Sequence, residues 1–240
     1  MNQHTQTNTN TDVVNYAQSI TMLQMQKQIN DVMGPGWMER KLPYLRAVFV
    51  ESSEALEHHG WKWWKKQTMN LPQLQKELID IWHFYLSHLL LVNDGHPEHA
   101  YSVLEVSAIS EMDGVVFDGC YRSFAEMDTM QKLELIGGLA VAKRLSIGLF
   151  ASLLEDVDLT WFELYRQYVG KNTLNAFRQD HGDKQGTYVK VWDNKEDNVH
   201  LVEILDQAQE KGLAEDAGLK EYVYAELKAR YLDFVGRNIA

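Results

Sequence analysis

Two short stretches decide the fold of this chain: ESSEALEHHG at residues 51–60 and KELIDIWHF at residues 76–84. Each stretch holds two acidic residues three positions apart: Glu51 and Glu54 in the first, Glu77 and Asp80 in the second. On an α-helix this spacing puts both carboxylates on one face, with their Cβ atoms about 5–6 Å apart. The sequence therefore predicts two helices that each present a pair of acids on one side.

The residues beside these acids are largely apolar, which predicts that the acids face an interior rather than bulk water. They are Phe49, Val50, Leu56, Leu78, Ile79, Ile81 and Trp82. Four carboxylates that converge in such a setting repel one another unless a cation lies between them. Mg²⁺ takes oxygen ligands and usually shares its coordination shell with substrate phosphates. The pattern predicts a magnesium site, and the alternative is that these acids are solvated charges on helix faces.

Composition limits the classes of function that fit. The chain has 240 residues, 45 % of them hydrophobic, which suffices for one sizeable core. Its net charge of −11 argues against nucleic acid or a membrane surface as a partner, because both attract positive charge. No apolar run reaches the ~18 residues that span a bilayer. Cys120 is the single cysteine, so no disulfide can form within the chain, and the cytoplasm is the expected setting.

We predict an all-α fold, a helical bundle in which four core helices carry the EXXE…EXXD metal site. Strict alternation of apolar and polar residues is not sustained, and the chain has no internal repeat. Residues 1–11 are expected to form a disordered leader and residues 12–240 a single domain. Within that domain we expect two mobile parts, residues 96–127 and the polar, glycine-containing segment 170–195.

Prolines and capping residues set the expected helix boundaries. Pro43 and Pro72 are predicted to open the two acidic helices, which then end near Gly60 and Val92. The remaining helices are expected at residues 13–33, 97–110, 121–127, 129–153, 159–169, 197–211 and 217–236, with Asp128 and Asp158 as N-caps. Segment 170–195 is expected to hold a short helix, a loop and a brief extended piece.

A loop rich in tryptophan and lysine, GWKWWKKQ at residues 60–67, joins the two acidic helices. A nucleobase could stack on Trp64 while one of the lysines meets a phosphate. The alternative is that these indole rings cap a helical core. The loop is therefore a candidate binding element beside the acidic pairs.

A second basic cluster lies in GKNTLNAFRQDHGDKQGTYVK, residues 170–190. One helical face is predicted to carry Lys171, Asn175 and Arg178, which follow the spacing i, i+4, i+7. Gly170 is expected to free the chain at the start of that helix. Lys190 follows later in the same cluster. Arg and Lys side chains that converge on one site can hold a polyphosphate. The alternative is a solvated helix face, and the chain has no Walker loop.

Three further polar residues lie close in sequence to apolar positions. His83 follows Asp80 by three residues, and three roles stay open for it: metal ligand, hydrogen-bond donor to a substrate, or core histidine. Gln26 and Asn30 are amides spaced i, i+4 beside an apolar stripe. An amide can donate and accept at once, which suits the edge of a nucleobase, although surface placement is the alternative.

The EXXE motif, the KWWKK turn, ELIDIWHF and the block GKNTLNAFRQDHG, in this order, resemble the dimeric dUTPases of the all-α nucleotide pyrophosphohydrolase superfamily. The similarity runs from about residue 20 to about residue 200. The EXXE…EXXD signature is shared across that superfamily, whereas HGWKWWKK together with GKNTLNAFRQDHG is specific for the dUTPase branch. The resemblance implies Mg²⁺-dependent hydrolysis of dUTP to dUMP and pyrophosphate by a homodimer, with dUDP as a further candidate substrate.

The resemblance also implies a role for each residue above. The metal ligands would be Glu51, Glu54, Glu77 and Asp80, and Glu51 would help to activate the attacking water. The uracil would be enclosed by Gln26, Asn30, Trp64 and His83. The phosphates would be held by Lys62, Lys65, Lys171, Asn175, Arg178 and Lys190, with segment 170–195 closing over them. The family usually has a tyrosine where this chain has Asp183, whose carboxylate cannot stack on the sugar.

Three other interpretations stay open. A pyrophosphohydrolase of the same superfamily that acts on dCTP would differ only in its base pocket. A di-iron carboxylate oxidase would use His83, although that class needs a Glu-X-X-His motif in each of two helices. A non-enzymatic helical interaction module would need neither the acidic pairs nor the basic clusters.

Overall fold

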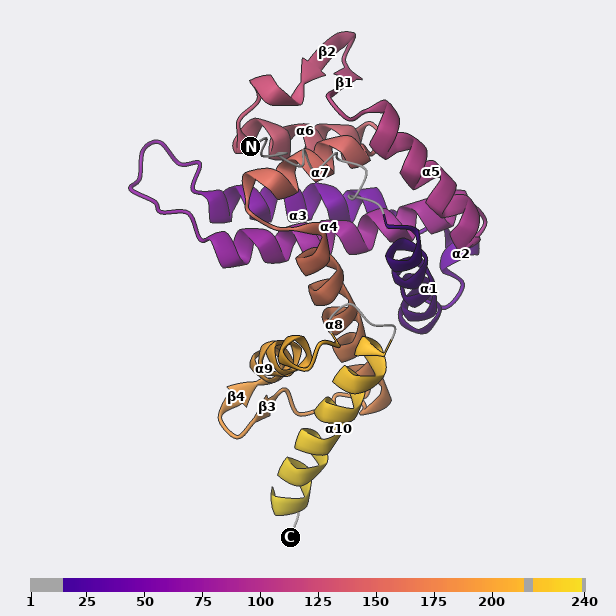
Figure 1. Ribbon diagram of the computed structural model, residues 1–240, viewed down its shortest axis with the longest axis vertical. Helices are drawn as coiled ribbons and strands as arrows, with labels where there is room; N and C mark the ends of the chain where they lie inside the picture. Colours follow the sequence, from indigo (N-terminus) through magenta and orange to yellow (C-terminus); the bar gives the residue numbers. More distant parts are fainter. Residues whose placement is uncertain (1–14, 214–217, 239–240) are drawn as a thin grey trace, which may run out of the picture.

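The structure, a computed structural model, describes residues 15–213 and 218–238 (Figure 1). The predicted leader, residues 1–11, therefore lies outside the described residues. Helices make up most of the described chain, which confirms the all-α fold, and the strands form two short antiparallel hairpins. No described helix is both long enough and apolar enough to cross a membrane.

The helices and strands follow one another in a simple order. The helices are α1 (Tyr16–Met33), α2 (Trp37–Arg40), α3 (Tyr44–His59), α4 (Leu71–Val92), α5 (Pro97–Ser110), α6 (Thr129–Val141), α7 (Ile147–Asp156), α8 (Trp161–Asp180), α9 (Asp197–Glu210) and α10 (Leu219–Asn238), with a 3-10 turn η2 (Phe124–Glu126). The strands are β1 (Gly114–Phe117) paired with β2 (Cys120–Ser123), and β3 (Val191–Trp192) paired with β4 (Lys195–Glu196).

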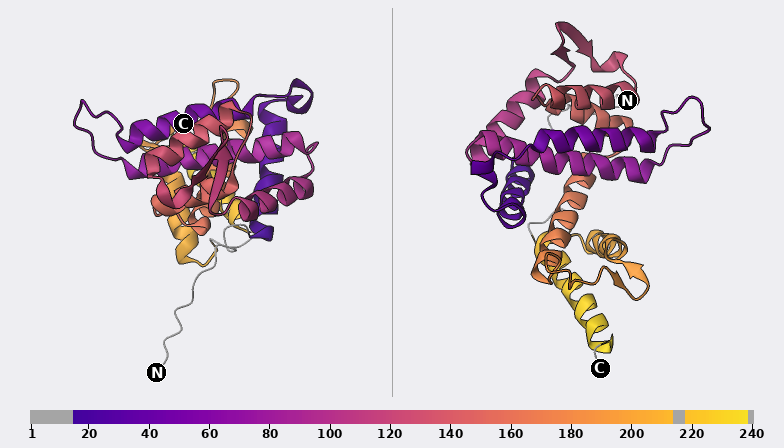
Figure 2. Two further views of the ribbon diagram at one scale, coloured as in Figure 1. Left: turned by 90° about the horizontal axis from the view of Figure 1, so that it is seen from above. Right: turned by 180° about the vertical axis from the view of Figure 1, so that it is seen from behind.

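An antiparallel pair, α3 and α4, forms the centre of the molecule (Figure 1). α6 packs against α3, while α1 and α8 pack against α4. The other two views show the same arrangement, with the loop between α3 and α4 projecting from one end of the pair and α1 lying toward the other end (Figure 2). Four helices, α1, α3, α4 and α8, thus carry the predicted metal ligands and most of the predicted binding residues.

α8 is longer than predicted and extends from the central pair into a lower part made of α9, α10 and the β3–β4 hairpin (Figure 1). The helix predicted at 159–169 continues through Gly170 to Asp180, so the short helix expected at the start of segment 170–195 is the second half of α8 and not a separate helix. A Cβ atom at Gly170 would lie 2.8 Å from the Cδ1 atom of Leu205 on α9. Gly170 therefore permits close helix packing, and our prediction that it begins a helix was wrong.

Other predicted boundaries were wrong for reasons that the backbone shows. The helix predicted at 121–127 is instead β2 followed by η2, because Asp118 and Gly119 have φ of 49° and 72° and turn the chain into a hairpin. The helix predicted at 129–153 is split into α6 and α7, because Lys143 has a left-handed φ of 61° and Ser146 caps α7.

Capping residues explain two further helix starts. Asp128 caps α6 as predicted and forms a capping box with Gln131, in which each side chain bonds the other residue's backbone N–H. Asp158 does not cap α8. It has a positive φ of 53°, and the hydroxyl of Thr160 accepts the bond from the backbone N–H of Glu163 instead.

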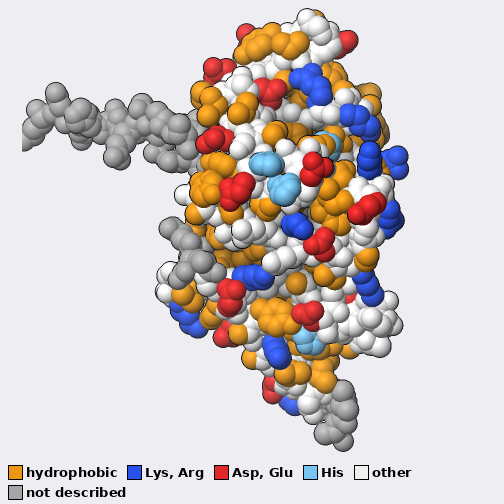
Figure 3. All heavy atoms as spheres, turned by 90° about the vertical axis from the view of Figure 1, so that its right-hand side faces the viewer, with side chains coloured by type: hydrophobic (Ala, Val, Ile, Leu, Met, Phe, Trp, Pro, Cys, Tyr) orange, Lys and Arg blue, Asp and Glu red, His pale blue; other side chains and the backbone are white. Residues whose placement is uncertain are grey.

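The face of the molecule on the α1 and α5 side carries acidic, basic and hydrophobic side chains intermixed (Figure 3). Such a surface lacks the continuous basic patch that would attract a phosphate backbone.

Candidate active site

Three carboxylates converge where α3 packs on α4. Oxygen atoms of Glu51, Glu77 and Asp80 all lie within 4.8 Å of one another. Glu77 is buried, with 2 % of its surface exposed, and the other two are partly buried. Within residues 15–213 and 218–238, this is the one group of acidic, histidine or cysteine side chains close enough to share a metal ion.

Glu54 lies outside this group. The buried face of α3 consists of Leu45, Val48, Ser52 and Ala55. Glu54 is exposed and borders a groove with Phe49, Val50 and Trp61. Phe49 and Val50 are each 45 % exposed, so the predicted inward orientation of this part of α3 was wrong. The structure gathers three of the four predicted carboxylates.

The carboxylates disturb one another's ionisation. Burial raises the pKa of Glu51 to about 7, and the negative charges of Asp80, Glu54 and Glu77 add to that rise. A proton or a cation is needed to relieve this repulsion. Without either, Glu51 would have to hold a negative charge among three others. The site therefore favours a bound cation on electrostatic grounds.

Basic side chains reach the same oxygen atoms. Nζ of Lys171 on α8 donates to Oδ1 of Asp80. Nζ of Lys76 lies 3.1 Å from Oε1 of Glu77 and 3.8 Å from Oδ2 of Asp80, and Nε2 of His58 lies 3.5 Å from Oε1 of Glu77. The sequence interpretation missed Lys76 and His58, although the i, i+4 spacing of Lys76 and Asp80 was visible.

The donor set fits a hard divalent cation. All three converging groups offer carboxylate oxygens, which are the ligands that Mg²⁺ prefers, and no sulfur ligand is among them. The half-exposed lysine Lys76 can move aside into solvent when a cation binds. The group thus meets the chemical requirement for a hard divalent cation, and two lysines lie beside its oxygen atoms.

A buried polar network begins one helical turn beyond Asp80, at His83. Oε1 of Gln26 on α1 lies 2.9 Å from Nδ1 of His83 and 2.8 Å from the hydroxyl of Tyr168 on α8. Nε2 of Gln26 donates to Oδ1 of Asn30 at 3.0 Å and to Oγ of Ser87 at 2.8 Å. The structure therefore brings Gln26, Asn30 and His83 together, in the interior rather than on the surface.

Two atoms of this network have no partner. Nδ2 of Asn30 and Nε2 of His83 are buried and make no hydrogen bond in the described structure. Burial lowers the pKa of His83 to about 3, and the charge of Lys171 adds to this effect. His83 is therefore neutral at physiological pH. Buried polar atoms without partners are rare in proteins, and these two are free to bind a ligand.

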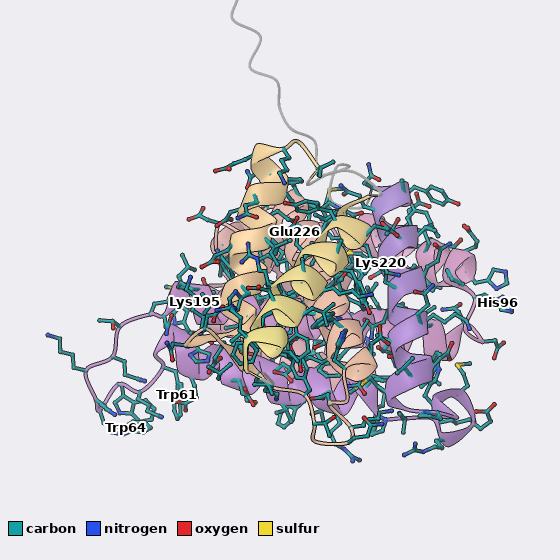
Figure 4. The ribbon with its side chains drawn as sticks, turned by 90° about the horizontal axis from the view of Figure 1, so that it is seen from below. Trp61, Trp64, His96, Lys195, Lys220 and Glu226 are labelled. Carbon is teal, nitrogen blue, oxygen red and sulfur yellow. The ribbon has the colours of Figure 1, made fainter. Side chains whose placement is uncertain are left out.

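Trp64 lies far from that network within one chain. It is 59 % exposed on the loop that leaves α3, and its ring packs edge-on against Trp61 and Trp63. The part of α4 from Leu71 to His83 alone spans about 18 Å. Figure 4 shows Trp61 and Trp64 on the projecting loop, beyond the end of the molecule opposite α1. Trp64 cannot stack on a base beside its own Gln26.

The loop lysines lie apart from the carboxylates as well. Nζ of Lys62 is 2.5 Å from Oε2 of Glu57 and 5.8 Å from the ring centre of Trp61. Lys65 is exposed on the same loop. The structure therefore does not bring these two predicted phosphate-binding residues to the metal site of the same chain.

The other predicted phosphate-binding residues divide into two groups. Lys171 reaches the carboxylates, as described above. Arg178 donates from Nε and Nη2 to the two carboxylate oxygens of Asp197, each at 2.8 Å, and its Nη1 lies 3.3 Å from Oδ1 of Asn175. Lys190 is exposed, and Asp183 accepts a bond from Nε2 of Gln179. Arg178 is thus bound to a buried acid that the sequence interpretation did not single out.

An α-helical protein with converging carboxylates, lysines at their oxygens and an adjacent buried network of hydrogen-bonding groups has the features of an all-α nucleotide hydrolase. The comparison with known families gives a more specific result, because residues 19–182 match the dUTPase family. This match spans more than half of the chain. The protein therefore belongs to the all-α, dimeric dUTPase family and is a dUTP diphosphatase, which hydrolyses dUTP to dUMP and pyrophosphate.

The comparison with curated proteins gave no match. The family confirms the resemblance inferred from the sequence, and nothing in the comparisons favours dCTP over dUTP. The di-iron oxidase and the non-enzymatic module are inconsistent with a dUTP diphosphatase family.

Proposed function

We propose that this dUTPase binds Mg²⁺ through Glu51, Glu77 and Asp80, and that dUTP is hydrolysed beside these residues. The observation that carries the proposal is the approach of three carboxylate oxygens to within 4.8 Å of one another. Glu54 is our proposed fourth ligand, because its charge is close enough to Glu51 to contribute to the raised pKa. A cytoplasmic setting stays a prediction from the single cysteine.

In this mechanism, Mg²⁺ when bound would neutralise charge on the phosphates and lower the pKa of a water molecule. Glu51 would accept the proton of the attacking water, because it lies in the carboxylate group beside which the nucleotide is hydrolysed. Lys171 and Lys76 would turn from the carboxylates to the phosphate oxygens and stabilise the charge that develops there.

The uracil would bind to the buried network of α1 and α4. Asn30 offers an unpaired amide donor and His83 an unpaired ring nitrogen, so both can bond the edge of a base. Gln26 holds these two side chains rather than offering free atoms, since each polar atom of its amide already has two partners. Asn175, Arg178 and Lys190 remain proposed phosphate ligands, and Arg178 would have to share or leave Asp197.

We propose further that the protein is a homodimer in which Trp64 acts at the site of the partner subunit. The loop that carries Trp64 projects away from its own base network (Figures 1 and 4). Beside it, Phe49 and Val50 of α3 are exposed and could be covered by a second copy. Lys62 and Lys65 on the same loop would then approach the partner's phosphates.

The central experiment measures pyrophosphate release from dUTP, dCTP, dTTP and UTP, and phosphate release from dUDP, with and without Mg²⁺. We expect strong preference for dUTP, dependence on Mg²⁺, and a loss of turnover of at least a thousandfold in Glu77→Gln. Glu134→Gln, an exposed glutamate on α6, is the matched control. Turnover that survives metal removal would contradict the proposed metal site.

Subunit mixing tests the role of Trp64. Trp64→Ala and Glu77→Gln should each be inactive alone, and a mixture should regain activity. In the mixed dimer, one site keeps its own Glu77 and receives Trp64 from the other subunit. A mixture that stays inactive, although sedimentation shows mixed dimers, would place Trp64 outside the partner's site.

A further inference from the structure

The side-chain amide of Gln26 is the centre of the buried network, and its orientation determines what the network offers to a ligand. An amide can face either way, with its oxygen and nitrogen exchanged, and the neighbouring donors and acceptors select between the two. In the structure, Oε1 faces His83 and Tyr168, and Nε2 faces Asn30 and Ser87. All four partners are buried.

The orientation of Gln26 fixes the tautomer of His83. Oε1 of Gln26 carries no hydrogen, so Nδ1 of His83 must donate the bond of 2.9 Å that joins them. A neutral imidazole has a single N–H group, and Nε2 is therefore left with a lone pair. Because Nε2 has no partner in the structure, the network offers a buried acceptor at this atom.

The same orientation fixes the amide of Asn30. Nε2 of Gln26 donates to Oδ1 of Asn30, so that oxygen is held inside the network. Nδ2 of Asn30 keeps its hydrogens unpaired and is buried. The network thus offers one free donor at Asn30 and one free acceptor at His83.

This pattern matches uracil and opposes cytosine. Uracil has a donor at N3–H with carbonyl acceptors on both sides. Cytosine has an acceptor at N3 and an amino group at position 4. An acceptor at His83 can bind N3–H of uracil while the donor at Asn30 binds an adjacent carbonyl. With cytosine, the lone pair of N3 would face the lone pair of Nε2 of His83, so neither nitrogen would form a hydrogen bond.

Two hydroxyl groups hold Gln26 in this orientation. Oγ of Ser87 lies 2.9 Å from the backbone carbonyl of His83, one turn earlier in α4, and donates its hydrogen there. It can then accept from Gln26 only if Nε2 faces it. The hydroxyl of Tyr168 lies 2.8 Å from Oε1 of Gln26 and 3.0 Å from the carbonyl of Met22, and its shorter bond is the one to Gln26.

We propose that Ser87 and Tyr168 are positioning residues that decide the preference for uracil over cytosine by holding the Gln26 amide, and through it the hydrogen-bonding pattern of Asn30 and His83. The proposal rests on the proposed function, since it takes this network to be the base site. Tyr168 also stacks on the ring of His83, with 4.2 Å between ring centres, and so holds its plane. Neither hydroxyl needs to touch the base.

The first test does not need a substrate. In protein labelled with ¹⁵N-histidine, His83 is assigned from the signal lost in His83→Gln, and its ring nitrogen shifts report the tautomer. We expect Nδ1 to be protonated and Nε2 to be unprotonated. A proton on Nε2 would overturn the inference, whether or not the protein hydrolyses dUTP.

The second test compares kcat/KM for dUTP with kcat/KM for dCTP. We expect Ser87→Ala and Tyr168→Phe to lower the ratio of the two by at least tenfold, and Ser87→Thr, which keeps the hydroxyl, to restore it. The matched controls are Ser19→Ala and Tyr85→Phe, which remove buried hydroxyls of α1 and α4 outside the network. These controls should keep the ratio of the unchanged protein.

The outcomes separate the two proposals. If the ratio is unchanged in both Ser87→Ala and Tyr168→Phe while the unchanged protein prefers dUTP, the positioning role is wrong and the proposed function stands. If the unchanged protein treats dUTP and dCTP alike, the uracil preference itself fails. In that case, the tautomer of His83 still tests the hydrogen-bonding pattern inferred for the network.

Discussion

Lys171 on α8 donates a hydrogen bond to Asp80 on α4 and so ties the helix with the predicted phosphate-binding residues to the carboxylate group. The two residues are 91 positions apart in the chain. Without a metal ion, the ammonium group neutralises part of the charge that would repel Glu51. In the proposed mechanism, the same lysine turns to the phosphates when metal and nucleotide bind.

Replacing this lysine should separate its two roles. We expect Lys171→Met to reduce kcat/KM for dUTP by about a hundredfold, because one charged contact to the transition state is worth roughly 3 kcal/mol. Mg²⁺ affinity without nucleotide, measured by calorimetry, should stay equal or increase, since a competing cation has left Asp80. Lys228→Met, an exposed lysine on α10, is the control. Weaker binding of Mg²⁺ by Lys171→Met would contradict the idea that Lys171 competes with Mg²⁺ for Asp80.

Glu54 provides the sharpest test of the metal site, because the structure leaves it exposed while the family resemblance makes it a ligand. We expect Glu54→Gln to lower turnover by at least a hundredfold, through a loss of charge next to Glu51. Mg²⁺ titrations at constant dUTP should show a higher metal requirement. The control is Glu105→Gln, which changes an exposed glutamate on α5. Near-normal turnover in Glu54→Gln would mean that only three carboxylates bind the metal ion.

The pH dependence of stability should reveal the crowding at Glu51. Its folded-state pKa is raised from 4.5 to about 7, so the folded protein binds this proton more tightly than the unfolded chain does. The stabilisation is complete below about pH 4.5 and is lost as pH rises through 7. In the presence of EDTA, we expect Glu51→Gln to unfold at a higher temperature than the unchanged protein at pH 8.

The same comparison at pH 5 is the control for this prediction. There Glu51 of the folded protein is largely protonated and resembles glutamine, so the two proteins should differ much less in unfolding temperature than at pH 8. Mg²⁺ at pH 8 should raise the unfolding temperature of the unchanged protein more than that of Glu51→Gln. A difference between the two proteins that is the same at pH 5 and pH 8 would exclude Glu51 as its origin.

The helices that carry the carboxylates could be predicted from the sequence because local signals mark both of their ends. Pro43 and Gly60 bound α3, where Gly60 has a φ of 91°, and Pro72 lies in the first turn of α4. The hairpin at Asp118 and Gly119 also had a local signal, the Asp-Gly pair, which we did not use. No local signal predicts the role of Gly170, because that role depends on the close approach of Leu205 from another helix.

In the candidate site too, some residues could be singled out from the sequence and others could not. Gln26, Asn30 and His83 could be singled out because polar residues beside apolar stripes stand out in a sequence, and their role in binding the base stays a prediction from the family resemblance. Tyr168 and Ser87 were missed, since a hydroxyl on a buried helix face looks like ordinary packing until its partners are known. The position of Trp64 could not be predicted, because it depends on the direction in which a loop leaves the end of a helix.

The pairing of Arg178 with Asp197 should have a large effect on stability. Asp197 is buried, with 1 % of its surface exposed, and also accepts a bond of 2.9 Å from the hydroxyl of Tyr188. Arg178→Met would leave this acid without its cation, which costs about 3–5 kcal/mol for a buried pair. Arg237→Met removes an exposed arginine that pairs with Asp193 and should destabilise the fold far less than Arg178→Met does.

Urea unfolding at pH 7.5 measures both variants, and a third variant separates charge from shape. Arg178→Met with Asp197→Leu removes the whole pair and should regain part of the lost stability, because no unpaired charge stays buried. If Arg178 also holds phosphates, this double variant will be folded but will bind dUTP weakly. A stable Arg178→Met single variant would contradict the expected role of this ion pair in stability.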